Sequence, residues 1–447
     1  MLVSDTQEKP RIREKKFKPD LSNAGDLKLR GGLRPLMKSA EPDTLAQLHG
    51  SRGQLWNPKL RAVPSYYPME RSHRILRVDD NTLRDVTQNI ISCLRVMSVQ
   101  ALFSDDPARA ALLSSDQVEM QVYLWEISGG REICVEIQRR QGDSVAFHRY
   151  GRHLLDAAGG DFDPSEFHDY GDAQYLKAAE KLLKSELAKS NDRDDALVAI
   201  DIAASLLAKE RLDARVLGLE SLCILTDPRK SRMSTAMLAS RAVILGSAGA
   251  VDEKNHETFG IFGKIHEFVV NLVVNKTMDD EQSLVGEMEA EYDSDDDDFF
   301  EVEEMEGRPP EYANAFGAML QFALTILSNA WEVMTSCQGS TDSMQESLSS
   351  ISHHFHNSCA RLTNGNVMVA LLEELARCLR HPHNAAAAAK CLGMMCQVSR
   401  DLRALAVELG GVDIARRAQL TGSFSHARLE ADATMLTSSL LLREERH

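Results

Sequence analysis

Apolar spacing along residues 71–158 predicts a small mixed domain. Ile75 to Val78 forms a short apolar run typical of a strand, and from Thr82 the apolar residues recur at helical spacing. Two later runs alternate apolar and polar residues around Ser128-Gly129-Gly130, which indicates a β-hairpin, and Ser144 can cap a helix after them. The order strand, helix, antiparallel strands, helix predicts a two-layer α+β domain.

From Gln174 onward, amphipathic helical periods follow one another. They predict successive helices that each offer one apolar face, at Tyr175–Leu187, Ala196–Leu207, Ala214–Leu225 and Met233–Leu245. Such a series over residues 174–447 predicts an α-solenoid, in which each unit buries its face against its neighbours, and a compact bundle is the alternative. Tyr312 to Trp331 lacks charge, but Gln321, Thr325 and Ser328 share one stripe, so we expect a buried helix and not a membrane span.

An acidic segment interrupts this helical pattern. Glu287 to Glu306 holds twelve carboxylates and no cation, so we expect a disordered insertion over residues 278–310. Ser294 precedes Asp295 to Asp298 and is a candidate phosphorylation site for acid-directed kinases. The insertion is either a solvated spacer or a segment that folds back on a groove of the helices or on the basic arm.

Residues 1–70 and 159–173 lack the periodicity of a folded element. The first segment carries thirteen Lys and Arg against eight Asp and Glu, with repeated Pro and Gly, and predicts a disordered basic arm. The second is rich in acids and turn formers and predicts a linker. The net charge is −16, most of it in the acidic segment, so the helices offer no large basic field and nucleic acid is not an expected partner.

The cysteine pattern and the amino-terminal sequence indicate the cellular compartment. The eight cysteines are scattered without C-x-x-C spacing, and no apolar stretch follows a basic region at the amino terminus. We therefore expect a reducing, cytoplasmic environment. A nuclear location stays open, because the cations between Arg11 and Lys18 also fit an import signal.

Local motifs of the small domain carry a family resemblance. Residues 137–147, Ile-Gln-Arg-Arg-Gln-Gly-Asp-Ser-Val-Ala-Phe, with the helix after them, resemble the end of the kinase-associated domain at the carboxyl terminus of microtubule-affinity-regulating kinases. Arg71-Ser-His-Arg74 resembles the start of that domain, and Val118 to Val122 its central strand. The resemblance implies a module that binds anionic phospholipid headgroups and, in kinases, restrains the catalytic domain. The motifs of a kinase domain are missing from this chain.

The resemblance also implies which cations would meet lipid. They fall on Arg71, Arg74 and Arg139, with Arg140 close by and Gln138 at a position that is basic in the relatives. Each cation near an anionic surface contributes about 1 kcal/mol, so these arginines imply weak attachment and a peripheral place at the inner membrane surface. The alternative is that they are ordinary solvated surface.

The last helical block resembles an armadillo repeat. Leu371 to Leu379 is followed by a break at Pro382, by Ala385 to Ala389, and by a helix that ends at Gly410-Gly411, where two helices can turn sharply. Ala214 to Leu225 resembles the middle helix of another repeat. The resemblance implies an armadillo-like solenoid that grips an extended segment of a partner.

Catalytic signatures are missing from the sequence. It contains no Walker loop, dinucleotide fingerprint or nucleophile elbow. His353, His354, His356 and Cys359 cluster, but neighbouring helical positions point about 100° apart, so we interpret them as structural or surface residues. We expect a non-enzymatic adaptor without cofactor or metal, whose solenoid holds a protein partner and whose small domain binds phospholipid weakly. The alternatives are a regulatory subunit of a separate kinase or GTPase, whose small domain binds protein instead of lipid, and a hydrolase with converging His and acids.

Overall fold

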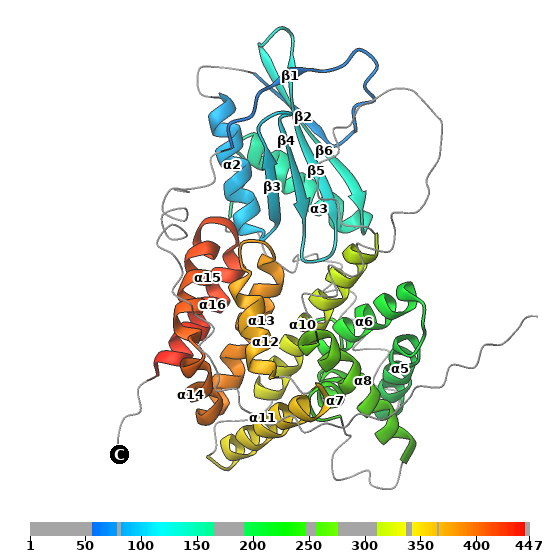
Figure 1. Cartoon of the computed structure of the whole chain (residues 1–447). Helices are drawn as coiled ribbons and strands as arrows, with labels where there is room; N and C mark the ends of the chain where they lie inside the picture. Colours follow the sequence, from blue (N-terminus) through cyan, green and yellow to red (C-terminus); the bar gives the residue numbers. More distant parts are fainter. Residues whose placement is uncertain are drawn as a thin grey trace, which may run out of the picture.

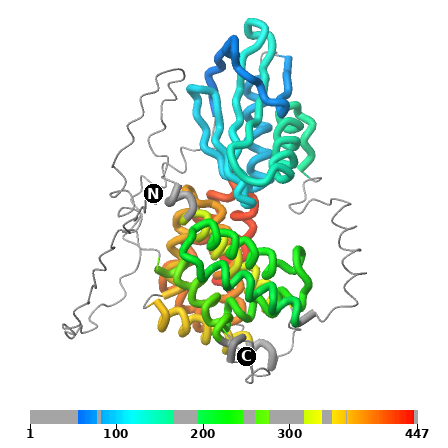
Figure 2. The backbone as a smooth tube through the Cα atoms, turned by 90° about the vertical axis from the view of Figure 1, so that its right-hand side faces the viewer, coloured from blue at the N-terminus to red at the C-terminus, as the bar shows by residue number. Residues whose placement is uncertain are grey.

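A computed structural model describes residues 56–77, 82–164, 192–246, 256–275, 311–336, 342–363 and 366–442. These residues form a small sheet module (56–164) and a larger helical body (192–442), and Figures 1 and 2 show the module above the body. Each part has its own hydrophobic core, one between Trp56 and Ala158 and the other between Ile200 and Leu440. The predicted helix at Tyr175–Leu187, the predicted insertion 278–310 with Ser294, and residues 1–55 of the predicted arm lie outside the described residues.

The sheet module contains a mostly antiparallel sheet with the strand order β2-β6-β5-β4-β3, to which β1 adds by parallel pairing with β5. Its strands are β1 (Arg61–Ala62), β2 (His73–Arg77), β3 (Gln100–Ser104), β4 (Arg109–Leu113), β5 (Glu119–Ile127) and β6 (Glu132–Gln141). Helices α2 (Thr82–Val96) and α3 (Ser144–Ala158) share the module's core with the sheet. The order strand, helix, antiparallel strands, helix agrees with the prediction, although the apolar pattern did not reveal β4.

The predicted hairpin is the pair β5 and β6. Its turn needs left-handed backbone at three successive residues, and Ser128, Gly129 and Gly130 have φ angles of 55°, 64° and 85°. The cap of α3 differs from the prediction by one residue. Asp143, and not Ser144, accepts a hydrogen bond from the backbone nitrogen of Ala146 at 2.7 Å.

Residues Trp56 to Glu70, here called the strap, belong to the folded module. Trp56 is 4% exposed, stacks near Phe103 with ring centroids 5.1 Å apart, and donates to the carbonyl of Ser104. β1 pairs in parallel with Trp125 and Glu126 of β5, past the residues of β5 that pair with β4. The predicted boundary at residue 71, with a disordered arm before it, is therefore wrong for residues 56–70. The strap escaped the pattern because β1 has two residues and three prolines break its periodicity.

The helical body follows the predicted helical periods. Its helices are α5 (Asp192–Leu207), α6 (Leu212–Thr226), α7 (Met233–Leu245), α8 (His256–Val274), α10 (Glu311–Ser336), α11 (Asp342–Thr363), α12 (Val367–Ala376), α13 (Pro382–Val398), α14 (Arg400–Glu408), α15 (Gly411–Ser425) and α16 (Ala427–Leu441). The uncharged stretch from Tyr312 lies in α10, where Leu324, Ile326 and Trp331 are fully buried. No helix in the described part of the chain is long and apolar enough to cross a membrane.

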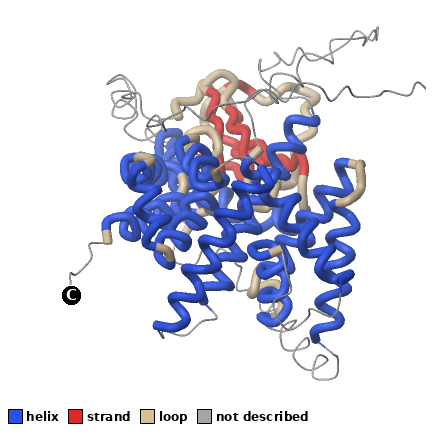
Figure 3. The backbone as a smooth tube through the Cα atoms, turned by 60° about the horizontal axis from the view of Figure 1, so that its bottom comes forward, coloured by secondary structure: helices blue, strands red, loops and turns tan. Residues whose placement is uncertain are grey.

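Helix α10 lies at the centre of the body. It packs against α6, α7 and α8 on one side and against α13 on the other, and α13 packs in turn against α16. Figure 3, coloured by secondary structure, shows the helices of the body packed side by side and the strands gathered in one place. The protein is thus mainly helical, with one small sheet module before the helical body. This arrangement brings one face of α10, α13 and α16 under the sheet module.

Candidate functional site

Polar side chains from three helices line a groove under the sheet module. On α10 they are Gln321, Thr325, Ser328 and Glu332, on α13 His383 and Lys390, and on α16 Arg428 and Asp432. The α10 residues are spaced by four, three and four positions, which places them on one stripe of the helix. The enclosed part of the groove has a volume of about 30 Å³, which is room for one or two water molecules. The sequence showed the stripe, but not what it would face.

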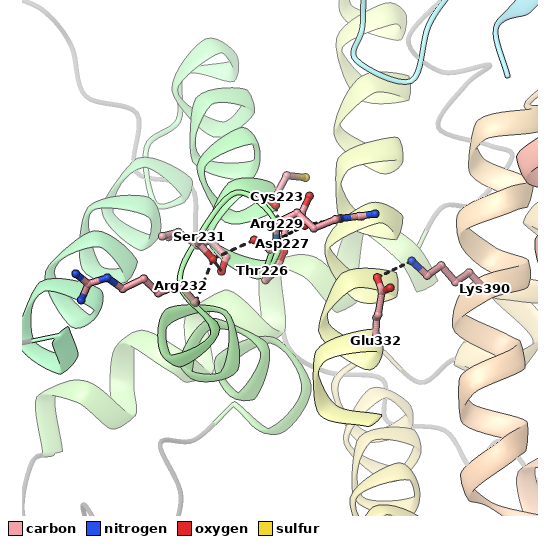
Figure 4. A network of polar contacts seen from close by, with 9 residues as sticks. Cys223, Thr226, Asp227, Arg229, Ser231, Arg232, Glu332 and Lys390 are labelled. Atoms are coloured by element: carbon pink, nitrogen blue, oxygen red, sulfur yellow. Dashed lines mark hydrogen bonds and ion pairs between the residues drawn. The ribbon is translucent and has the colours of Figure 1, made fainter. Parts of the chain in front are cut away.

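An ion pair crosses the groove between α10 and α13. Lys390 Nζ lies 2.7 Å from Glu332 Oε2, and the two side chains are 12% and 33% exposed (Figure 4). Asp432 faces the same groove from α16, and its Oδ2 atom is buried without a hydrogen-bond partner among the described residues. Burial raises the pKa of Asp432 to about 6, although the nearby Arg428 and Lys390 oppose the shift. The groove thus contains a carboxyl group that can accept a donor from a ligand.

The turn between α6 and α7 places a further charged pair beside α10. The Asp227 side chain is 3% exposed and accepts hydrogen bonds from the backbone nitrogen and Nε of Arg229, at 3.0 and 3.1 Å. Figure 4 shows the Arg229 side chain reaching toward α10. Cys223 Sγ contacts the carbonyl of Phe322 at 3.6 Å and so ties α6 to α10. Charges of both signs therefore occur across four successive parts of the body: Asp227 and Arg229, Glu332, Lys390, and Arg428 and Asp432.

The turn between β4 and β5 closes one end of the groove. Gln321 Nε2 donates to the carbonyl of Ser115 at 3.2 Å, and His383 Nε2 lies 3.0 Å from the carbonyl of Leu113. No local pattern indicates this contact, because the residues that meet are more than two hundred positions apart.

A larger hollow of about 240 Å³ lies between α5 and α8. Its apolar walls include Ala204, Leu207 and Ile265. Its polar side chains, Lys264, Glu267 and Asn271, all come from α8 and so do not converge from different helices. The groove is the better candidate because polar side chains from three helices meet in it.

The structure does not bring the four lipid-binding candidates to one point. The Arg74 side chain lies at the end of α3. It contacts the carbonyl of Leu155 in α3 at 3.2 Å and Oδ2 of Asp161, just after α3, at 2.6 Å. Arg139 donates to the carbonyl of Gly142 and lies four residues along β6 from the partner of Arg74, or about 13 Å away. Arg71 is exposed just before β2.

Arg140 lies on the opposite face of the sheet from Arg139, because side chains alternate along a strand. It donates to Gln121 and, at 2.8 Å, to the hydroxyl of Tyr123. If the family resemblance holds, replacing Arg71 and Arg139 with alanine should reduce sedimentation with phosphatidylserine vesicles at low salt, whereas Arg140→Ala should not. Equal sedimentation of the double variant and the unaltered chain would refute the lipid prediction.

The opposite face of the sheet holds a buried carboxylate that the sequence did not reveal. Glu136 is fully buried and accepts hydrogen bonds from the Tyr67 hydroxyl at 2.8 Å, the Glu70 backbone nitrogen at 2.7 Å and Trp125 Nε1 at 3.0 Å. Burial, and then the hydrogen bond to Glu136, raise the pKa of Tyr67. The alternation of β6 puts Glu136 on a face that the sequence pattern gives to solvent, and in the structure the strap residues Tyr67 and Glu70 contact it together with Trp125. The cluster fixes the strap to the sheet.

The histidine cluster of α11 is not arranged for hydrolysis. His353 Nε2 lies 3.3 Å from Ser399 Oγ and 3.4 Å from Asp401 Oδ2, so both groups meet the same ring nitrogen. A Ser-His-Asp triad needs the acid on the other nitrogen. Ser399 is also fully buried and caps α14 through the backbone nitrogen of Leu402. Among the described residues, no three His, Cys, Asp or Glu side chains gather in a way that could hold a metal ion.

Comparison of the chain with protein-family models, curated proteins and solved structures found no match.

Proposed function

We propose that this chain is a non-enzymatic adaptor that holds an extended segment of a partner protein along the groove between α10, α13 and α16. The observation that carries the proposal is the set of charges of both signs at the groove: the Glu332–Lys390 pair between α10 and α13, with Arg428 and Asp432 of α16. An extended segment carries backbone donors and acceptors as well as charged side chains. Alternating carboxylates and cations can meet both kinds of group along its length.

The order of helix packing supports an armadillo-like solenoid for this body. In the series from α10 to α16, a helix packs against the third helix after it in three cases: α10 with α13, α13 with α16, and α12 with α15. A repeating unit of three helices produces such rows, because each unit packs on the next in the same way. The groove residues then come from equivalent helices of neighbouring units.

Photo-crosslinking tests the groove. A photoreactive residue in place of Glu332, which is 33% exposed, should capture a partner polypeptide, and the same residue in place of the exposed Glu210 in the turn between α5 and α6 should not. Lys390→Ala should lower the crosslinking yield at Glu332 about tenfold, the effect of about 1.4 kcal/mol of lost binding. The proposal would be contradicted if the same polypeptides were captured at both positions. It would also be contradicted if Lys390→Ala left the crosslinking yield at Glu332 unchanged.

A further inference from the structure

Polar contacts join the sheet module to the helical body, whereas the hydrophobic cores of the two parts are separate. Arg95 of α2 donates to the carbonyl of Ser423 at 2.7 Å and pairs with Glu430 at 2.6 Å. Gln100 of β3 donates to the carbonyl of Arg380 at 2.8 Å. Polar interfaces between domains permit relative movement, because parting them exposes little apolar surface.

Two buried imidazoles form a relay across this junction. The backbone nitrogen of Leu429 donates to Nδ1 of His426 at 3.1 Å, and Nε2 of His426 lies 3.1 Å from Nδ1 of His383. Nε2 of His383 then meets the carbonyl of Leu113 at the end of β4, at 3.0 Å. The exposed fractions of His383 and His426 are 8% and 1%. The relay therefore runs from the start of α16, through α13, into the sheet module.

The two backbone groups fix the protonation of both rings. The nitrogen of Leu429 can only donate, so Nδ1 of His426 has no proton and Nε2 of His426 carries one. The carbonyl of Leu113 can only accept, so the proton of His383 is on Nε2 and its Nδ1 accepts from His426. Both rings are neutral, and an added proton on either Nδ1 breaks a contact of the relay.

We propose that the sheet module is a removable cap on the groove, and that proton uptake by the His383 and His426 relay releases it and opens the groove to the partner segment. The inference rests on the function proposed above for the groove. Release would remove the carbonyls of Leu113 and Ser115 from the groove residues His383 and Gln321, and would expose the enclosed end.

The charges around the relay act in both directions. Burial, then His383, then Arg428 lower the pKa of His426, so the capped state resists the proton that the open state accepts. Protonation of Asp432 has the opposite effect on the equilibrium between the two states. Its pKa is raised to about 6 in the capped groove, so its protonation favours the capped state as the pH falls. Lys390 and Glu332 form an ion pair at the groove, and Arg95 of the sheet module pairs with Glu430 of α16.

The sign follows from proton counts. The capped state binds fewer protons on its histidines than the open state does, so capping is strongest above an ordinary imidazole pKa of about 6.5 and weakens as the pH falls. When the pH falls from 7.5 to 5.5, each imidazole that takes up a proton on opening raises the equilibrium constant for opening about tenfold. Protonation of Asp432 in the capped state lowers the same constant about fourfold. With both imidazoles counted, the net effect is about 25-fold.

Hydrogen exchange of the full chain measures this opening without any partner. The backbone nitrogen of Arg428 donates to Ser98 Oγ of the sheet module, so its exchange reports on the junction. The backbone nitrogen of Leu429 donates to His426 at the start of α16, so its exchange reports on the relay. After correction for intrinsic rates, protection in residues 425–432 and 111–118 should fall about 25-fold between pH 7.5 and 5.5. Protection in α7 should not change, because the helical body stays folded.

Variants separate the relay from other acid effects. The double variant His383→Gln/His426→Gln, whose amides do not titrate, should lose the acid-induced fall whatever its protection at pH 7.5. Asp432→Asn should deepen the fall to about 100-fold by removing the opposing proton. A fall that persists in the double variant, equal protection at both pH values in the unaltered chain, or a parallel fall in α7 would overturn the proposal. None of these outcomes bears on the crosslinking result at Glu332, so the two proposals fail separately.

Discussion

A chain that begins at Arg71 is expected to have a strongly destabilised sheet module, whereas a chain that begins at Trp56 is expected to keep it folded. The truncation removes Trp56, which is 4% exposed in the module core, and burial of an aromatic side chain of this size contributes about 3–5 kcal/mol. It also removes two donors to the buried Glu136, the Tyr67 hydroxyl and the Glu70 nitrogen.

Thermal unfolding of the two chains tests this expectation. The transition of the sheet module should shift to lower temperature or disappear in the chain from Arg71, while the transition of the helical body stays in place because the cores are separate. Tyr67→Phe in the full chain isolates one donor and should cost about 1–2 kcal/mol. Equal midpoints for the two truncated chains would show that the strap contributes nothing to folding.

Trp331→Ala is expected to destabilise the helical body by about 3–5 kcal/mol. Trp331 is fully buried in α10, and its ring lies edge-on to Phe355 of α11 with centroids 5.7 Å apart. The substitution leaves a cavity at the helix that supplies the polar stripe of the groove. For a body of this size the loss corresponds to about 6–20 °C in the midpoint of unfolding.

Trp331→Phe is the matched control. The indole Nε1 of Trp331 is buried and has no hydrogen-bond partner among the described residues. Phenylalanine keeps most of the aromatic volume and removes this unpaired group, so we expect a change of about 1 kcal/mol or less. In calorimetry, the helical body of the alanine variant should therefore unfold at a much lower midpoint temperature than that of the phenylalanine variant. Similar unfolding midpoints for the two variants would mean that side chains around α10 rearrange to fill the cavity left by Trp331→Ala.

Local pattern was enough to predict the elements whose signal lies within one continuous stretch of sequence. The hairpin of β5 and β6 is the predicted one, and α7 has the predicted bounds, because both follow from the spacing of neighbouring residues. The strap was missed since its contacts are long-range: Tyr67 meets Glu136, which lies 69 positions later. Armadillo repeats and the kinase-associated domain stay predictions.

The candidate site shows the same division. The stripe of Gln321, Thr325 and Ser328 is visible in the sequence, yet nothing local shows that Lys390 and Asp432 face it from other helices. The candidate lipid-binding residues show the opposite case, in which residues close in sequence do not lie together in the structure. Arg139 and Arg140 are adjacent in sequence, but strand alternation sends their side chains to opposite faces.

The central position of α10 has a consequence for how the chain withstands cutting. Side chains of α10 bury themselves against α6, α7 and α8, which precede it, and against α13, which follows it. The covalent link between Asn275 and Glu311 is therefore not what joins the two halves of the body. A single proteolytic nick in that interval would leave two fragments held as one particle, in the manner of a complemented split protein.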